Sequence, residues 1–442
     1  MLKKVVIVGA GPSGLLLAQY LLRRGDNYQV EIYERRSDPR IVAFSKSRTY
    51  PISLNERGMY ALRQIEGLEA AVKDISLVMN GTIFHQRNGK TRYSPRQNPL
   101  FTLDRTNLAI AILEDLTNKY HHRLNIHFDC QCQQVDFATK TLTVINKSEV
   151  SEEVFTVHYD FLVGADGAYS AVRESLKLTA NFSCEQKYIP TDYKSFFLPN
   201  LDANSKINLA ADKIHSWMLK DGTVVFLLHQ LGKTMSGIIH FPRQQNQVAN
   251  LATQQEVLNF FQANFPDIGQ LMPASEAEAF GNKQPSTVLT VRCQSYHYGD
   301  SVLLIGDAAH AVSPSIGQGC NAALEDVLIF DQLLDEYSDN IPQAIAQFTV
   351  RRQPDGYALV ELGNNAFPLS QGLFIEYLIR DISAKILHKL FPKNFAQPLF
   401  YLISETTVPY AEILNLYQGW IAKVKKSNEK FQDLPNNSLN LL

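Results

Sequence analysis

Hydrophobic and polar positions follow a pattern that predicts strand, turn, helix and strand at the start of the chain. Residues 5–8 form a short apolar, β-branched run, as expected of a buried parallel strand. The turn sequence "GAGPSG" follows at once, residues 15–22 have helical character, and "YQVEIYERR" supplies the next strand. This order of elements is typical of one half of a dinucleotide-binding fold.

Strand-to-helix patterns of the same kind recur in pieces that are separated along the chain. We therefore predict an α/β protein with a discontinuous Rossmann-type nucleotide-binding domain at 1–180 and 286–365, interrupted by a hairpin at about 78–100. Alternating runs such as "TMSGIIHFP" predict an antiparallel substrate-binding sheet at 181–285. The remaining residues, 366–442, are predicted to form a helical region.

Two lysines and an apolar run at the N-terminus also resemble a secretory signal. Glycines and Pro12 interrupt that run, and it ends in "RRG" without the small-residue cleavage site of a signal. No segment reaches the ~18 consecutive apolar residues that a membrane span needs. We therefore expect a cytoplasmic protein without a membrane span.

Charge and cysteine usage narrow the classes of partner. The chain has 42 basic and 44 acidic residues, a net charge of −2, which gives no support for a nucleic-acid partner. Its five cysteines are odd in number and scattered, which fits a reducing compartment better than a disulfide framework. Cys130 and Cys132 would share one face of a strand, but without a second pair or a histidine cluster they predict packing. No metal site is expected.

The glycine turn has the residues that a dinucleotide requires. Gly9 permits the tight turn, Gly11 lets the backbone approach a pyrophosphate, and Gly14 lets helix and strand pack closely. The helix N-terminus then offers N–H groups to the phosphates. Glu34 ends the second strand, where an acidic side chain accepts hydrogen bonds from ribose hydroxyls.

Two further motifs lie in "DFLVGADGAYSAVRESL" and in "GDSVLLIGDAAHAVSPSIGQGCNAALEDVLIF". Each by itself is also typical of an ordinary strand-to-helix turn. In this order and at these distances, the three motifs resemble those of the single-component flavoprotein hydroxylases, the class A monooxygenases that share the p-hydroxybenzoate hydroxylase fold. The resemblance extends to about Gly363 and implies FAD as the cofactor, with NADPH or NADH as the co-substrate.

The resemblance also implies where the cofactor and substrate lie. The cofactor-binding residues would be Gly9, Gly11, Gly14, Glu34, Arg35, Arg48, Arg105, Asp166, Asp307, Gly319 and Asn321. The catalytic positions beside the flavin ring would be Pro314, Gly317 and Gln318. Our candidates for contacts with the substrate are Trp217, Phe226, His229 and Ile316, together with His215 and His240, although each is also typical of a packed position. His310 is expected to be a packing group at a helix start.

In the mechanism that the resemblance implies, NAD(P)H reduces FAD, and O₂ adds to the reduced flavin to give a C4a-hydroperoxide. This species transfers oxygen to a small aromatic molecule. The stretches "SRTYPISLNERG" and "YIPTDYKSFFLP" resemble the kynurenine 3-monooxygenase and violacein-pathway branch, which suggests a substrate related to kynurenine, tryptophan or indole. Thr82 and Pro99, however, stand where that branch holds a carboxylate with Arg and Tyr. Arg87, Arg92 or Arg96 could substitute.

Other interpretations remain open at this point. A halogenase shares this fold, but its W-x-W-x-I-P run is absent, since the only tryptophans are Trp217 and Trp420. A prenyl reductase would consume NADPH without O₂, and a non-catalytic FAD-binding protein would do neither. The helices from about Ser370 are expected to cover the substrate pocket with an apolar face that includes Ile375 and Ile382. Alternatively, they only stabilise the fold or a homodimer.

Overall fold

A computed structural model describes residues 2–42, 51–86, 88–147, 152–201, 207–232, 234–244 and 246–432. Its first sheet has six strands in the order β16-β17-β10-β1-β2-β6, and all neighbours are parallel except β16 and β17. The strands are β1 (Lys3–Val8), β2 (Tyr28–Tyr33), β6 (Leu124–His127), β10 (Phe161–Gly164), β16 (His297–Tyr298) and β17 (Val302–Leu304). The predicted strand, turn, helix and strand at the start of the chain are therefore confirmed.

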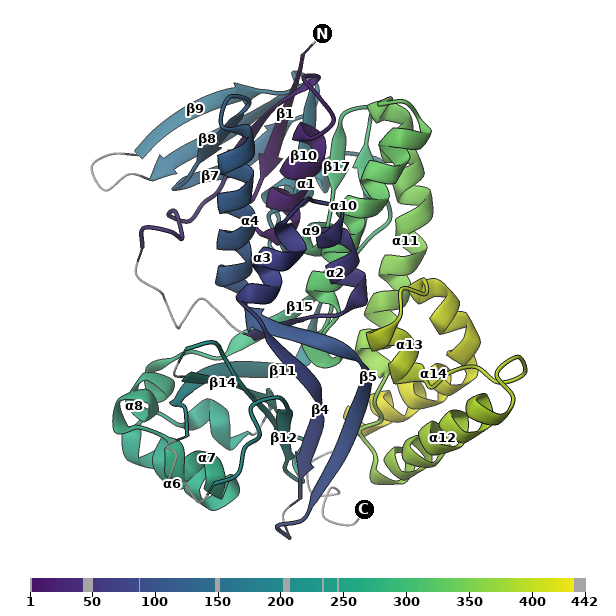
Figure 1. The fold of residues 1–442 in the computed structure, drawn as a ribbon. Helices are drawn as coiled ribbons and strands as arrows, with labels where there is room; N and C mark the ends of the chain where they lie inside the picture. The colour runs from purple at the N-terminus through teal and green to yellow at the C-terminus, as the bar shows by residue number, and fades with distance from the viewer. Residues whose placement is uncertain are drawn as a thin grey trace.

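Helices pack along this parallel sheet, as Figure 1 shows. They are α1 (Pro12–Leu22), α2 (Glu56–Arg63), α3 (Leu68–Asp74), α4 (Arg105–Tyr120), α5 (Ala171–Leu176), α9 (Asp307–His310), α10 (Gly319–Glu336) and α11 (Ile341–Asn365). The strands of the sheet centre are apolar and almost fully buried, and α1 is buried along its whole length. Burial on both faces explains the continuous apolar runs in these strands.

A small antiparallel sheet of three strands adjoins the parallel sheet near β2. Its strands, in the order β7-β8-β9, are β7 (Cys130–Asp136), β8 (Thr141–Lys147) and β9 (Glu152–His158). Cys130 and Cys132 are both buried in the main apolar core, in agreement with their predicted packing role. In the described ranges, no group of three or more His, Cys, Asp or Glu side chains could hold a metal ion.

The second large sheet has eight strands in the order β15-β11-β14-β13-β12-β4-β5-β3. They are β3 (Pro51–Leu54), β4 (Leu77–His85), β5 (Thr91–Asp104), β11 (Cys184–Pro199), β12 (Ile214–Met218), β13 (Val224–His229), β14 (Thr234–Pro242) and β15 (Ser286–Cys293). The antiparallel strands expected in 181–285 are present as β11 to β14. The predicted hairpin, β4 with β5, is not separate from them, because β4 pairs in parallel with β12.

Three helices cover one face of this eight-stranded sheet and enclose a second apolar core. They are α6 (Gln254–Asn264), α7 (Pro266–Leu271) and α8 (Ala274–Asn282). In Figure 1 they lie beside the β11–β14 part of the sheet, whereas the C-terminal helices lie on the other side of the β4–β5 hairpin. The face without these helices is consequently the one left for the cofactor domain.

The predicted helical C-terminal region is confirmed. It consists of α12 (Gln371–Leu390), α13 (Leu399–Glu405) and α14 (Tyr410–Gln432). Leu402, Ile403 and Ile421 pack with residues of α10 and α11 in a third apolar cluster. In the part of the chain that the structure describes, no helix combines the length and apolar character that crossing a membrane requires.

Candidate active site

The turn after β1 needs glycine at two positions because other backbone segments approach it there. Gly9 has a φ of +105°, and a Cβ at this position would lie 2.5 Å from the carbonyl oxygen of Ala165. A Cβ at Gly14 would clash with the carbonyl oxygen of Gly9. These glycines therefore let the start of α1 pack tightly against β1 and the end of β10.

Gly11 differs, because no neighbouring protein atom explains its lack of a side chain. Among the described residues, the nearest atom to a Cβ at Gly11 would be Nη2 of Arg105, 3.9 Å away. No side chain caps α1 at Gly11, so N–H groups of its first turn face the same space. An open space between a helix N-terminus and a guanidinium fits a diphosphate. The residues present at this position therefore fit the diphosphate of FAD.

Glu34 lies at the end of β2, where it holds the glycine turn and borders the same space. Its Oε2 accepts a hydrogen bond from the N–H of Ala10 at 2.9 Å, and Oε1 accepts one from the N–H of Arg36 at 3.0 Å. Each carboxylate oxygen keeps a lone pair with which it can accept from a ribose hydroxyl. Arg35 is exposed beside it. Arg48, also predicted to bind the cofactor, lies outside the described residues.

The acidic residues of the other two motifs differ in what they contact. Oδ2 of Asp166 accepts from the N–H of Ala171 at 2.6 Å at the start of α5, while Oδ1 is buried without a hydrogen-bond partner in the described structure. Burial raises the pKa of Asp166. Asp307 is half-buried, and within the described ranges its carboxylate has no hydrogen bond or ion pair. A carboxylate held in the fold without a protein donor fits the ribityl hydroxyls assigned to Asp307.

The loop before α10 contains exposed residues and one buried residue whose side chain forms hydrogen bonds within the protein. Pro314 and Gly317 are exposed, although the loop lies among packed elements. Gln318 is buried: its Oε1 accepts from Nδ2 of Asn55 at 3.1 Å and from the hydroxyl of Tyr410 at 3.0 Å. Pro314 and Gly317 are thus free to border a flavin ring, whereas the side chain of Gln318 fixes the loop.

The buried side chains of Asn321 and Ile316 hold the same loop in place. The amide of Asn321 is fully buried and bonds to the carbonyls of Ser53 and Gly317 and to the N–H of Asn55. Ile316 is buried in the C-terminal apolar cluster. The structure therefore gives these two side chains a supporting role, which was not expected from the sequence.

A buried ion network supports the third motif and was missed in the sequence. Asp326, on α10, accepts from the N–H of Gly306 at 2.8 Å, from Nε2 of His310 at 2.6 Å and from Nε of Arg352 at 2.9 Å. Burial opposes the charge of His310, but the charge of Asp326 outweighs it and raises the pKa of His310. His310 is thus a hydrogen-bonded partner of Asp326 in this network rather than a simple packing group.

Asp326 holds both sides of Asp307, since it bonds to the residue before it and to the side chain three residues after it. It thereby fixes the backbone that presents the Asp307 carboxylate. The sequence signal for this role was the acidic pair "ED" six and seven residues after Gly319, which an α-helical pattern alone does not separate from a solvated face.

The eight-stranded sheet places the substrate candidates on opposite faces. Phe226 and His240 share a face with Tyr193, with ring centroids 6.4 Å apart for Phe226 and His240 and 5.7 Å apart for Tyr193 and His240. Burial raises the pKa of Tyr193 against a smaller opposing effect of the Arg105 charge, so Tyr193 lies on the side of the sheet nearer to Arg105. We define Tyr193, Phe226 and His240 as the inner face.

Trp217, His229 and His215 alternate to the other face, and their predicted contact with substrate is not supported by this placement. Trp217 is part of the apolar core under α6–α8, and Nε2 of His229 bonds to the carbonyl of Leu209 at 3.0 Å. Because side chains alternate along a strand, a shift of one residue decides the face. Nothing in the residue pattern indicates which face of the sheet meets the cofactor.

Of the helices from about Ser370 that were expected to cover the substrate pocket, α13 contacts Arg96 and Asn55, whereas the predicted apolar stripe of α12 does not face the pocket. The carbonyl of Ser404 accepts from Nη2 of Arg96 at 2.8 Å and from Nδ2 of Asn55 at 3.1 Å. The carboxylate of Glu405 accepts from the N–H of Asn98 at 2.8 Å. The apolar stripe of α12 instead faces solvent at 52–62% exposure, at Ile375, Ile379, Ile382, Ile386 and Leu390.

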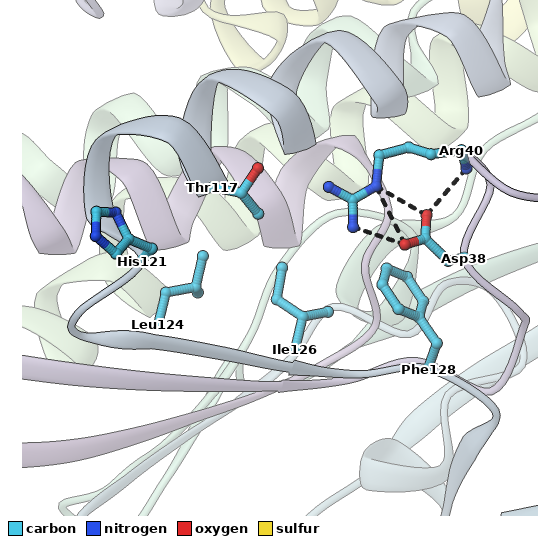
Figure 2. Close-up of a pocket in the computed structure, with 7 residues that line it drawn as sticks. All are labelled: Asp38, Arg40, Thr117, His121, Leu124, Ile126 and Phe128. Atoms are coloured by element: carbon cyan, nitrogen blue, oxygen red, sulfur yellow. Dashed lines mark hydrogen bonds and ion pairs between the residues drawn. The ribbon is translucent and has the colours of Figure 1, made fainter.

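Two hollows lie away from these residues. One, of about 320 Å³, lies between the end of α4 and the edge strand β6, as Figure 2 shows, with an ion pair between Asp38 and Arg40 at one end. The other, of about 490 Å³, lies beside Tyr357 on α11 and Leu414 on α14. Neither contains a residue of the glycine turn, of the loop before α10 or of the inner face.

Comparison with known proteins agrees with this geometry. The family described as "FAD binding domain" matches residues 3–361. Kynurenine 3-monooxygenase of Sus scrofa is 30% identical over 427 residues, covering 95% of this chain and 87% of the relative. The enzyme of the same name from Salinispora tropica is 31% identical, covering 93% and 90%.

Solved structures with lower identity share the fold. The tetrameric form of 2-methyl-3-hydroxypyridine-5-carboxylic acid oxygenase has a TM-score of 0.67 at 20% identity, covering 83% of this chain and 91% of that one. Pseudomonas aeruginosa PqsL in complex with 2-aminobenzoylacetate has a TM-score of 0.63 at 20% identity, covering 83% and 95%.

We call the turn from Gly9 to Gly14, together with the segment that carries Asp307, the glycine-rich cradle. The fold and this cradle define an FAD-binding oxidoreductase. The chain belongs to the "FAD binding domain" family, and within it to the FAD-dependent aromatic monooxygenases that include the kynurenine 3-monooxygenases. It uses FAD with NAD(P)H as the co-substrate. Bound FAD supplies the chemistry that moves electrons from NAD(P)H to O₂ and delivers oxygen to an aromatic ring.

Proposed function

We propose that this monooxygenase hydroxylates a small aromatic molecule of the kynurenine, tryptophan or indole type that has a carboxylate, and that Arg96 binds this carboxylate. The names of the similar proteins and the aromatic inner face support the first part. Arg96 supports the second, because it is half-buried between β5 and α13. The protein would work in the cytoplasm; a homodimer stays a prediction.

Arg96 is the guanidinium best placed for this role among the candidates. Its Nε and Nη2 donate to the carbonyls of Asn98 and Ser404, while Nη1 has no hydrogen-bond partner within the described structure. Burial lowers the pKa of Arg96, because a charged guanidinium is disfavoured away from water. A bound carboxylate would supply a counter-charge and so offset this cost. Arg92 is exposed, and Arg87 lies outside the described residues.

Thr82 and Pro99 do not provide a contact for the substrate carboxylate. Thr82 lies on β4 opposite Ser94 and Ile214, and Pro99 is exposed. Neither side chain can donate the charge-assisted hydrogen bonds that a carboxylate prefers. The carboxylate contact would thus come from a different position on the same hairpin, and kynurenine itself is expected to be a poorer substrate than the preferred one.

The other residues bind, orient and exclude water. The first turn of α1 and Arg105 would hold the diphosphate, Glu34 the adenosine ribose and Asp307 the ribityl chain. Phe226 and Tyr193 would orient the aromatic ring, and burial lowers the pKa of His240 to about 4, so its imidazole is neutral at pH 7 and can accept a hydrogen bond from a phenol or aniline. Closure by α13 would keep water from the reacting atoms.

The test compares Arg96→Ala with Arg92→Ala. Substrate-stimulated NADPH oxidation and O₂ uptake are measured with L-kynurenine, L-tryptophan and indole, with products identified by mass spectrometry. Loss of a charged hydrogen bond of about 1.5–3 kcal/mol predicts a KM for the preferred carboxylate substrate that rises about 10- to 100-fold in Arg96→Ala. Equal changes in both variants would refute the assignment of Arg96.

The same assay separates the other classes of function. Hydroxylation consumes one O₂ for each product that gains one oxygen atom, whereas a reductase gives product without O₂ uptake. A non-catalytic FAD protein would reduce its bound flavin no faster with NADPH than free flavin is reduced. Product formation in the absence of O₂ would overturn the proposal.

A further inference from the structure

Cys184, at the start of β11, and Cys293, at the end of β15, face each other on neighbouring strands of the eight-stranded sheet. They are directly opposite in the antiparallel pair of β11 and β15, and their Sγ atoms are 3.5 Å apart. The N–H of Gln294 donates to the carbonyl of Ser183, so the cysteines occupy the adjacent non-hydrogen-bonded pair, with Cα atoms about 4.5 Å apart. Disulfides form at Cα separations of about 4.4–6.8 Å.

A buried cation lies beside the two thiols. Arg173 is fully buried, and its Nη atoms donate to the carbonyls of Ala308 and Ala168. Its Nε is also buried but has no hydrogen-bond partner in the described residues. The hydrogen bond from Cys293 and the charges of Arg173 and Lys177 lower the pKa of the Cys184 thiol, although burial acts against this.

The two sulfur atoms differ in access and in role. Cys184 is half-buried, so a small oxidant can reach it, whereas Cys293 is fully buried. The thiol of Cys293 is also 3.8 Å from the carbonyl oxygen of Ala308, next to Asp307. A half-accessible thiol with a lowered pKa, in contact with a second thiol, is the arrangement of an attacking and a resolving cysteine.

We propose that Cys184 and Cys293 are a modification site for hydrogen peroxide, which converts them to a disulfide. The Cys184 thiolate attacks one oxygen of hydrogen peroxide, the O–O bond breaks, and hydroxide leaves, giving a sulfenic acid. The sulfur of Cys293 then attacks the sulfur of Cys184, the S–O bond breaks, and the oxygen leaves as water with the proton from Cys293. The two thiols together lose two electrons, and peroxide gains them.

The enzyme itself can supply this oxidant. NAD(P)H and O₂ give hydrogen peroxide in a flavin monooxygenase whenever oxygen is not transferred to substrate. The disulfide would join two of the segments that connect the eight-stranded sheet to the cofactor domain. The proposal is independent of the substrate assigned above, because it can be tested with added peroxide.

The experiment treats the reduced, FAD-loaded protein with hydrogen peroxide, blocks remaining thiols with N-ethylmaleimide and maps the digest by mass spectrometry. We expect a cross-linked peptide joining Cys184 and Cys293, with a loss of two hydrogens, that dithiothreitol reverses. In Cys293→Ser we expect a dimedone adduct on Cys184, which identifies it as the attacking thiol. Cys320→Ser is the matched control and should form the cross-link as the unaltered chain does.

A second measurement avoids reliance on the variants folding correctly. In the unaltered reduced protein, limiting N-ethylmaleimide should label Cys184 before the four other cysteines. The melting temperature of the unaltered protein should rise after oxidation, because the cross-link constrains the unfolded chain, and that of Cys184→Ser should not. Peroxide that leaves both thiols free, or a dimedone adduct on Cys320 in preference to Cys184, would overturn the proposal.

Discussion

The glycine-rich cradle and the eight-stranded sheet differ in the groups that they present: the cradle presents mainly backbone atoms, and the sheet presents side chains of one face. In the cradle, backbone groups and a few charges near Gly9, Gly11 and Asp307 border the space for the cofactor, and Asp326 fixes the segment that carries Asp307. In the sheet, the face of the strand on which a side chain lies determines its surroundings. Phe226 therefore lies on the inner face, while Trp217 lies in the apolar core. A binding site made of backbone tolerates no added side chain, whereas a face of a sheet tolerates changes that keep its shape.

Two buried histidines show the same contrast. His310, in the cradle, bonds to Asp326, whose charge outweighs burial and raises its pKa. His215, in the sheet, has no carboxylate that outweighs burial, so burial lowers its pKa to about 4. Nε2 of His215 donates to the carbonyl of Ala210, and Nδ1 then accepts from His85, as a neutral ring allows. In the cradle, a carboxylate thus pairs with the buried histidine and fixes a motif, whereas the buried histidine of the sheet is neutral.

The largest effect is expected from Gly11→Asp, which should abolish FAD binding. The new side chain would enter the diphosphate space and add a negative charge next to the phosphates. Flavin absorbance per protein after purification measures this, with circular dichroism to check folding. Gly419→Asp is the control, because Gly419 is exposed and has no neighbour within 4 Å. A folded Gly11→Asp protein that keeps its yellow colour would contradict the cradle.

Asp326→Asn should destabilise the protein by about 3 kcal/mol, because it removes the buried carboxylate that His310 and Arg352 share, and Arg352 keeps only Glu325 and Asp355. Urea unfolding of the apoprotein measures this loss, and titration with FAD should show weaker binding. Glu336→Gln removes an exposed ion pair with Arg351 and should leave the midpoint unchanged. Equal midpoints for both variants would show that Asp326 does not fix the motif.

Phe226→Ala and Trp217→Ala should separate the two faces of the sheet. The first removes a ring from the inner face and should lower the fraction of oxidised NADPH that ends in hydroxylated product. The second opens a cavity under α6–α8 and should cost about 3–5 kcal/mol of stability without changing that fraction. The assays are product yield per NADPH and urea unfolding. If Trp217→Ala uncouples the reaction as much as Phe226→Ala does, our assignment of the faces is wrong.

The smallest effect concerns pH. The pKa of His215 is about 4 in the folded protein and about 6.5 in the unfolded chain, so unfolded molecules bind more protons between these values. Stability should therefore fall as pH is lowered from about 6.5 toward 4, and His215→Gln should reduce this slope in melting temperature. The reduction is partial, because His240 contributes in the same direction. An unchanged slope would mean that His215 is protonated in the fold.

The apolar strands, the glycine turn and its helix could be predicted from the sequence, because the interactions that make them are local. Gly9 and Gly14 are required by contacts within one strand–turn–helix unit and the strand beside it, so the motif and the geometry coincide. The helical C-terminal region followed from the spacing of apolar residues in the same way.

Only the tertiary structure decided which distant residues meet. The inner face depends on the register of strands from three parts of the chain, and a change of one residue would exchange Phe226 for Val225. The meeting of Asp326 with Gly306, of Arg96 with α13 and of Cys184 with Cys293 likewise depends on how packed elements align. Periodicity in a sequence reports that a side chain is buried, but the packing of other elements determines which partner it is buried against.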